Sequence, residues 1–166
     1  MKTYLSPHEL EARVEHELTS NRPSFHHSPL EDVIEILCEG RHYSWMGIYL
    51  AAGEKSQQLL EGGQDAHPAQ VALPETRSKI LVAIKLAGHE LGVLAVESDR
   101  ENAFSSEDRV LLENVATRLA RFLSGPGKYI VRKAKQAAEQ KVAKSSGPKF
   151  DTAGARTVRS AAVGEK

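Results

Sequence analysis

The sequence predicts an α+β domain in which an antiparallel sheet carries helices on one face, followed by a basic C-terminal tail. Three observations support this fold class. Two helix starts of the same kind lie near the N-terminus, two apolar strands joined by a short glycine turn follow, and a long amphipathic helix comes after them. Residues 127–166 differ from the rest, with ten Lys or Arg and only three Asp or Glu.

Both N-terminal helices are expected to begin with the pattern Ser-Pro-x-Glu. Ser6 and Ser28 occupy the N-cap, where the hydroxyl oxygen can accept a hydrogen bond from a backbone amide, and the proline that follows suits the first helical position. The second helix should end near Gly40. The apolar stripes contain Leu10, Val14 and Leu18 in the first helix and Leu30, Val33, Ile34, Leu37 and Cys38 in the second.

The middle of the chain has the composition of β-strands. Residues 45–50 are aromatic and β-branched, which predicts a strand that places Trp45 in the core, and a weaker strand is expected over 57–61. Residues 79–86 and 91–97 are apolar runs on either side of a glycine-containing turn, so they predict an antiparallel hairpin. Because both faces of this hairpin look apolar, we expect it to lie centrally in the sheet.

The C-terminal part begins with a third helix. Ser105 as N-cap, with Asp108 three residues later, predicts a helix that ends at 124–127. Residues 128–144 favour helix but have little apolar surface, and the composition beyond Ser145 predicts disorder. We therefore divide the chain into an N-terminal helix and linker over 1–27, a folded domain over 28–124, and a basic tail over 125–166 that is partly helical or disordered.

Net charge divides the chain in the same way. The whole chain has 22 residues of each sign, so the excess of seven positive charges in 127–166 leaves residues 1–126 with a net charge of −7. A basic tail of this kind could bind nucleic acid weakly and without sequence preference. It could equally keep the chain soluble or dock on a protein partner.

The sequence also restricts compartment and cofactor. No apolar run approaches the ~20 residues of a membrane helix, and the N-terminus lacks the apolar segment of a secretory signal. One cysteine, Cys38, excludes an internal disulfide and a cysteine-based metal site, and nothing near His26-His27 completes a set of metal ligands. We predict a cytoplasmic protein without membrane contact, metal or cofactor.

One part of the sequence resembles a known family. Residues 92–99, Gly-Val-Leu-Ala-Val-Glu-Ser-Asp, together with Ala103-Phe104-Ser105 and the following Glu107-Asp108, are similar to the last strand and last helix of GAF domains. The segment 45–49 resembles the first strand of that family. The resemblance covers roughly residues 28–124 and implies a GAF-like fold, while no residue in it is catalytic.

Within that family the sequence is most similar to free methionine-(R)-sulfoxide reductases, through the first strand and the Arg77-Ser78 pair before the hairpin. In that branch a cysteine thiolate attacks the sulfoxide and a second thiol resolves the sulfenic acid. The attacking cysteine aligns with Ala72, and three acidic substrate-binding positions align with Lys79, Ala95 and Glu97. The segment that would carry the resolving cysteine is missing.

These departures lead to a prediction of function. We predict that the chain is not an enzyme but a non-catalytic GAF-like sensor or regulatory domain in signal transduction, which binds a small-molecule ligand or a protein partner and forms a homodimer through its terminal helices. The predicted ligand-binding residues are Tyr49, Arg77, Glu97, Ser98 and Asp99. The last three could equally be an ordinary polar strand end, and Cys38 is expected to pack in the core.

Two other functions stay open. The first is a free methionine sulfoxide reductase-type enzyme, against which the absence of paired cysteines argues. The second is a nucleic-acid-associated protein that uses the basic tail.

Overall fold

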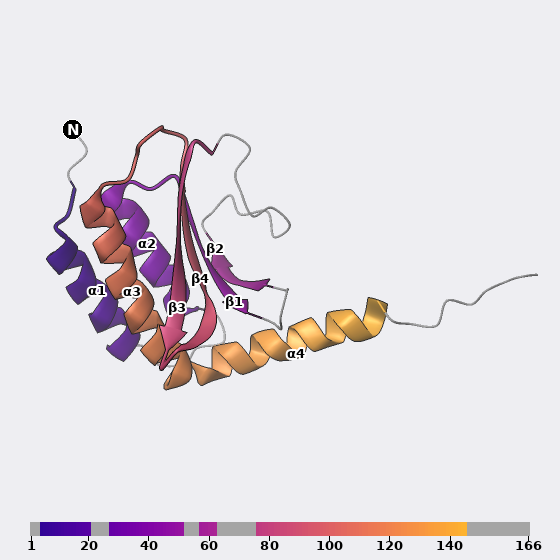
Figure 1. The fold of residues 1–166 in the computed structure, drawn as a ribbon. Coiled ribbons are helices and arrows are strands. Elements are labelled where there is room, and N and C mark those ends of the chain that lie inside the picture. Colours follow the sequence, from indigo (N-terminus) through magenta and orange to yellow (C-terminus); the bar gives the residue numbers. More distant parts are fainter. Residues whose placement is uncertain (1–3, 21–26, 52–56, 63–75, 146–166) are drawn as a thin grey trace, which may run out of the picture.

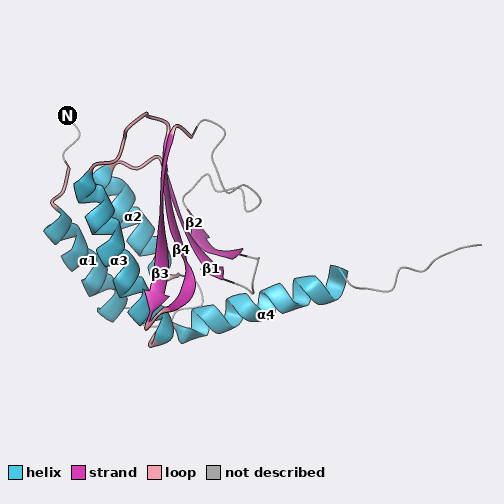
Figure 2. Cartoon of the chain, in the orientation of Figure 1, coloured by secondary structure: helices cyan, strands magenta, loops and turns pink. Residues whose placement is uncertain are grey.

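The computed structural model describes residues 4–20, 27–51, 57–62 and 76–145, which contain four helices and one antiparallel sheet of four strands (Figures 1 and 2). The helices are α1 (Pro7–Ser20), α2 (Pro29–Arg41), α3 (Ser106–Ser124) and α4 (Lys128–Ser145). The strands are β1 (Trp45–Ala51), β2 (Gln57–Gly62), β3 (Ser78–Leu86) and β4 (His89–Ser98). The predicted α+β class is confirmed.

The strands lie in the order β2-β1-β4-β3. The β3–β4 hairpin turns at Ala87 and Gly88, whose φ angles of 50° and 80° are typical of the tight turns that match the twist of a hairpin. The prediction of a central hairpin was wrong for one of its strands. β4 is central, but β3 is an edge strand, and Leu81 on it is 56% exposed because only alternate residues of β3 face the helices.

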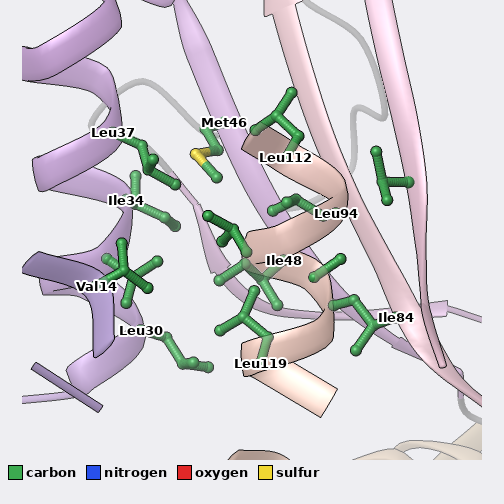
Figure 3. Close-up of a cluster of buried hydrophobic side chains, with 14 of the residues drawn as sticks. Val14, Leu30, Ile34, Leu37, Met46, Ile48, Ile84, Leu94, Leu112 and Leu119 are labelled. Carbon is green, nitrogen blue, oxygen red and sulfur yellow. The ribbon is translucent and has the colours of Figure 1, made fainter. Parts of the chain in front are cut away.

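Three of the helices form two layers over one face of the sheet. α2 and α3 pack directly on the strands, and α1 contacts both of them from outside (Figure 1). The main core lies between the sheet and these helices, and Figure 3 shows Met46, Ile48, Ile84 and Leu94 of the strands pointing toward Ile34, Leu37, Leu112 and Leu119 of the helices. The expected arrangement of helices on one face of an antiparallel sheet is therefore confirmed.

A second, smaller cluster lies on the opposite face of the sheet, which we call the far face. It contains Trp45, Tyr49 and Ala95. Trp45 is buried as predicted, but in this cluster rather than in the main core. Its indole ring lies over Gly47, where an added Cβ would come within 2.4 Å of a ring carbon, so glycine gives the ring its space.

The predicted helix ends are confirmed by their hydrogen bonds. The Ser28 hydroxyl accepts from the amide of Leu30, and Ser105 and Asp108 form a complete capping box at the start of α3. α2 ends at Arg41, one residue after Gly40, because His42 adopts a left-handed conformation with φ 57°.

α4 continues the chain beyond α3 and supplies the helical part of the basic tail. Its Ile130 and Val131 pack against the main core and its Ala134 is buried, which stabilises a helix that would be marginal alone. The disorder predicted beyond Ser145, like His26 and Ala72, lies outside the described residues. No helix in the described part of the chain has both the length and the apolar composition needed to cross a membrane.

Candidate functional site

Three charged or polar-tipped side chains form a row across the far face. Trp45 of β1 and Lys79 of β3 are both register partners of Glu97, which lies between them on β4. The side chains of directly opposed residues on neighbouring strands point to the same face of the sheet, and their Cβ atoms lie about 5 Å apart. The pairing therefore brings together an indole, a carboxylate and an ammonium that are distant in the sequence.

The Glu97 carboxylate is paired with groups of its own chain. Its side chain is fully buried, its Oε1 lies 3.2 Å from the Nζ of Lys79, and its Oε2 accepts a hydrogen bond of 2.6 Å from the Thr76 hydroxyl. Burial, together with the Glu97 carboxylate, raises the pKa of Tyr49, so its phenol stays protonated. The buried Nε1 of Trp45 has no acceptor among the described residues.

A second candidate site is a hollow at one end of the sheet, between the C-terminal end of α2 and the segment that joins β4 to α3. We call it the end hollow, and it encloses about 560 Å³. Its lining residues are Tyr4, Cys38, Arg41, His42, Tyr43 and Ser44, together with residues 98–104. The lining combines aromatic rings, charges of both signs and the single thiol of the chain.

The wall of the end hollow is held by the buried carboxylate of Asp108. Its Oδ1 accepts from the Arg41 guanidinium at 2.8 Å and from the Tyr43 hydroxyl at 2.9 Å, and its Oδ2 accepts from the amide and hydroxyl of Ser105. Burial alone would raise the pKa of Asp108, but these hydrogen bonds outweigh it and lower the pKa. The end of α2 is thus locked to the start of α3.

Cys38 is half-buried against the main core and also faces the end hollow. Burial raises the pKa of its thiol to about 11, so the thiol is protonated near neutral pH. Packing in the core was the prediction for Cys38, and the structure confirms it. Across the hollow, the Asp99 carboxylate accepts a hydrogen bond of 3.1 Å from the Ser44 hydroxyl, which holds it at the rim.

The five residues predicted to bind a ligand do not lie in one site. Tyr49 and Glu97 lie on the far face, while Ser98 and Asp99 line the end hollow. Arg77 is mostly exposed and lies 3.6 Å from Glu101.

Sequence reasoning did not identify Arg41, Tyr43 or Phe104 as site residues, although all three line the end hollow. The sequence feature that could have indicated this site is Arg41, because it is the only basic residue of the acidic helix α2.

No protein-family model and no curated protein matches the sequence. Solved structures do match the fold. The free methionine-R-sulfoxide reductase of Neisseria meningitidis, in complex with its substrate, is 19% identical with a TM-score of 0.57, over 83% of this chain and 99% of that one. The substrate complex of the Staphylococcus aureus enzyme is 18% identical with a TM-score of 0.57, over 74% and 99%. The type II enzyme of Thermoplasma acidophilum is 18% identical with a TM-score of 0.50, over 66% and 94%.

The chain has the fold of the free methionine-R-sulfoxide reductases. That fold is GAF-like, so the family resemblance drawn from β4 and α3 holds at the level of fold. Identities below 20% establish the fold and leave the activity to chemical argument.

The predicted function, in contrast, is contradicted. We predicted a non-catalytic sensor domain in signal transduction that is not an enzyme, and these neighbours are reductases rather than sensors. That prediction was wrong. It rested on the replacement of the family's functional residues by Ala72, Lys79 and Ala95. The loss of residues that one family uses does not show that a protein of similar fold lacks catalytic activity.

Proposed function

We propose that the chain is a thiol-dependent reductase that acts on a small free sulfoxide of the methionine sulfoxide type. The observation that carries this proposal is the likeness to two reductases solved with their substrate, which covers 99% of each enzyme. Because this fold carries out sulfoxide reduction in both enzymes, the same reaction class is the first to test in this chain.

The reaction in this chain requires Cys38. A sulfoxide reductase of this type needs a sulfur nucleophile, and Cys38 is the only cysteine in the sequence. It faces the end hollow, where Asp99 and Arg100 supply a carboxylate and a guanidinium. A zwitterionic amino acid presents the complementary pair, an ammonium for Asp99 and a carboxylate for Arg100.

The proposed chemistry balances with an external thiol. The Cys38 thiolate attacks the sulfoxide sulfur, the oxygen takes a proton from solvent, the sulfur–oxygen bond breaks, and the oxygen passes to Cys38 as a sulfenic acid while the thioether leaves. A first external thiol condenses with the sulfenic acid to a mixed disulfide and releases water, and a second displaces Cys38 and leaves as the oxidised disulfide. The external thiol is needed because the chain has no second cysteine.

The raised pKa of Cys38 determines how this reaction responds to pH. With a pKa of about 11, roughly one thiol in ten thousand is ionised at pH 7. Turnover is therefore slow at neutral pH and rises about tenfold per pH unit until the pH approaches the pKa. A catalytic thiol with a lowered pKa would give a flat profile over the same range.

The test is turnover of free methionine-R-sulfoxide and of its S epimer with excess dithiothreitol, followed by chromatographic measurement of methionine. We expect turnover of one epimer by the full chain and none by Cys38→Ser. Asp99→Asn should raise KM more than it lowers kcat, because Asp99 binds the ammonium and does not react. A chain that makes no methionine above the thiol background, or a Cys38→Ser variant as active as the original, would refute the proposal.

A further inference from the structure

The outer face of α2 carries negative charge that no Lys or Arg of the described residues balances. Glu31, Glu35 and Glu39 recur every four residues along this face and are all exposed, and we call them the acidic stripe. Glu31 lies 3.2 Å from the ring of His27. Within the described residues, no ion pair joins Glu35 or Glu39 to a basic side chain.

The carboxylates of α1 show what a balanced helix looks like in this protein. Glu9 pairs with Arg13 at 2.7 Å, and Arg118 of α3 pairs with both Glu11 at 3.1 Å and Glu15 at 3.5 Å. The acidic stripe of α2 is therefore not a general property of the acidic half of the chain. It is a local excess of negative charge on one helix face.

The matching positive excess lies on α4. This helix has six basic residues and a single acidic residue, Glu139. Lys128, Arg132 and Lys135 are exposed and fall on one side of the helix, and we call them the basic stripe. No ion pair in the described part of the chain involves them. Because an α-helix rises 1.5 Å per residue, the basic stripe is about 10 Å long and the acidic stripe is about 12 Å long.

The two stripes of one molecule do not meet. α4 runs from the end of α3 away from α1 and α2 (Figure 1), and its first turn packs against the core through Ile130 and Val131. In one molecule these exposed charges are solvated by water and counterions, and because the two helices point apart, their complementary charges can pair when a second molecule brings the stripes together.

We propose that α4 of one copy docks along the outer face of α2 on a second copy, with the basic stripe on the acidic stripe. In a twofold dimer each copy supplies both helices, so the contact occurs twice. A second copy suits this surface better than a nucleic acid does. Residues 1–126 carry a net charge of −7 and repel a polyanion, whereas two copies of a chain with no net charge do not repel each other.

The experiment is sedimentation velocity of the full-length chain over a range of concentrations, in roughly 0.05 M and roughly 0.5 M salt. We expect a dimer at low salt whose dissociation constant rises about tenfold or more at high salt, where the Debye length falls below 5 Å. Reversal of the acidic stripe to lysine, or of the basic stripe to glutamate, should give monomers. Equimolar mixing of the two variants should restore a dimer, because both contacts are then complementary again.

A matched control separates the stripe from net charge alone. Reversal of three exposed basic residues outside α4, namely Lys85→Glu, Arg109→Glu and Arg121→Glu, changes the net charge by the same amount and should leave the dimer intact. A chain that is monomeric at every concentration would overturn the proposal, as would a dimer that survives either stripe reversal. Retention of RNA or DNA that is lost on reversal of the basic stripe, with the chain monomeric, would assign α4 to nucleic acid instead.

Discussion

Replacement of Asp108 by alanine tests whether the lock between α2 and α3 holds the fold. The Asp108 side chain is 8% exposed and contacts the Arg41 guanidinium, whose side chain is also 8% exposed, at 2.8 Å. Removal of one partner of a buried ion pair costs about 3–5 kcal/mol, because the other charge stays buried. Loss of the capping interaction with Ser105 adds about 1 kcal/mol, and since these terms overlap we expect a total of about 4 kcal/mol.

The neighbouring Glu107 provides a matched control. It contacts the same Arg41 guanidinium at 3.2 Å, but its side chain is 56% exposed, so Glu107→Ala should cost less than about 1 kcal/mol. The free energy of unfolding is measured by urea titration followed by circular dichroism, with thermal unfolding as a second readout. For a chain of this size, a loss of 4 kcal/mol lowers the melting temperature by roughly 10 °C. If Asp108→Ala costs no more than Glu107→Ala, the lock does not stabilise the fold.

The same carboxylate predicts the direction of the pH response. The pKa of Asp108 in the folded chain is lower than its ordinary value of 3.8, so the folded state favours the ionised form. The contribution of the Asp108 carboxylate to the free energy of unfolding is complete at pH values above the ordinary pKa of 3.8, and it is lost as the pH falls through the pKa of the folded chain. We expect the urea midpoint to fall in acid, and to fall less in Asp108→Asn. An equal fall in both would assign the acid sensitivity to other groups.

Three further predictions concern the far face and the thiol. Lys79→Met should lower the free energy of unfolding by about 2 kcal/mol, because it removes the cation beside the buried Glu97 carboxylate and Lys79 itself is partly solvated. In urea titration, replacement of both residues by methionine should recover most of this loss. Gly92→Ala should cost about 3 kcal/mol or more, since its Cβ would lie 1.9 Å from the backbone oxygen of Tyr49, and a melting temperature equal to that of the original chain would contradict this. Alkylation of Cys38 by iodoacetamide at pH 8 should be about a hundredfold slower than for a thiol with the ordinary pKa of 9.0, and mass spectrometry that finds no such delay would show that burial does not raise the pKa of this thiol.

The sequence was a sufficient guide wherever a feature depends on residues close together in the chain. The caps at Ser28 and Ser105 follow from side chains that reach amides within three residues, and the turn at Ala87 and Gly88 needs only two positive φ angles. Helical periodicity likewise identified the buried faces of α1, α2 and α3. For these features, local geometry sets the outcome.

Strand order and the sites required the tertiary structure. Apolar composition did not distinguish β4 in the centre from β3 at the edge, because both carry an apolar row toward the helices. Glu97 and Ser98 are adjacent in sequence, yet side chains alternate along a strand, so one faces the far face and the other the end hollow. The partners of Glu97 are Thr76 and Lys79, about twenty residues away, and those of Asp108 include Arg41, 67 residues away. The sequence determined which segments form helices and strands, since those depend on neighbours along the chain, and only the packing of strands and helices decided which charges neutralise each other and which side chains share a hollow.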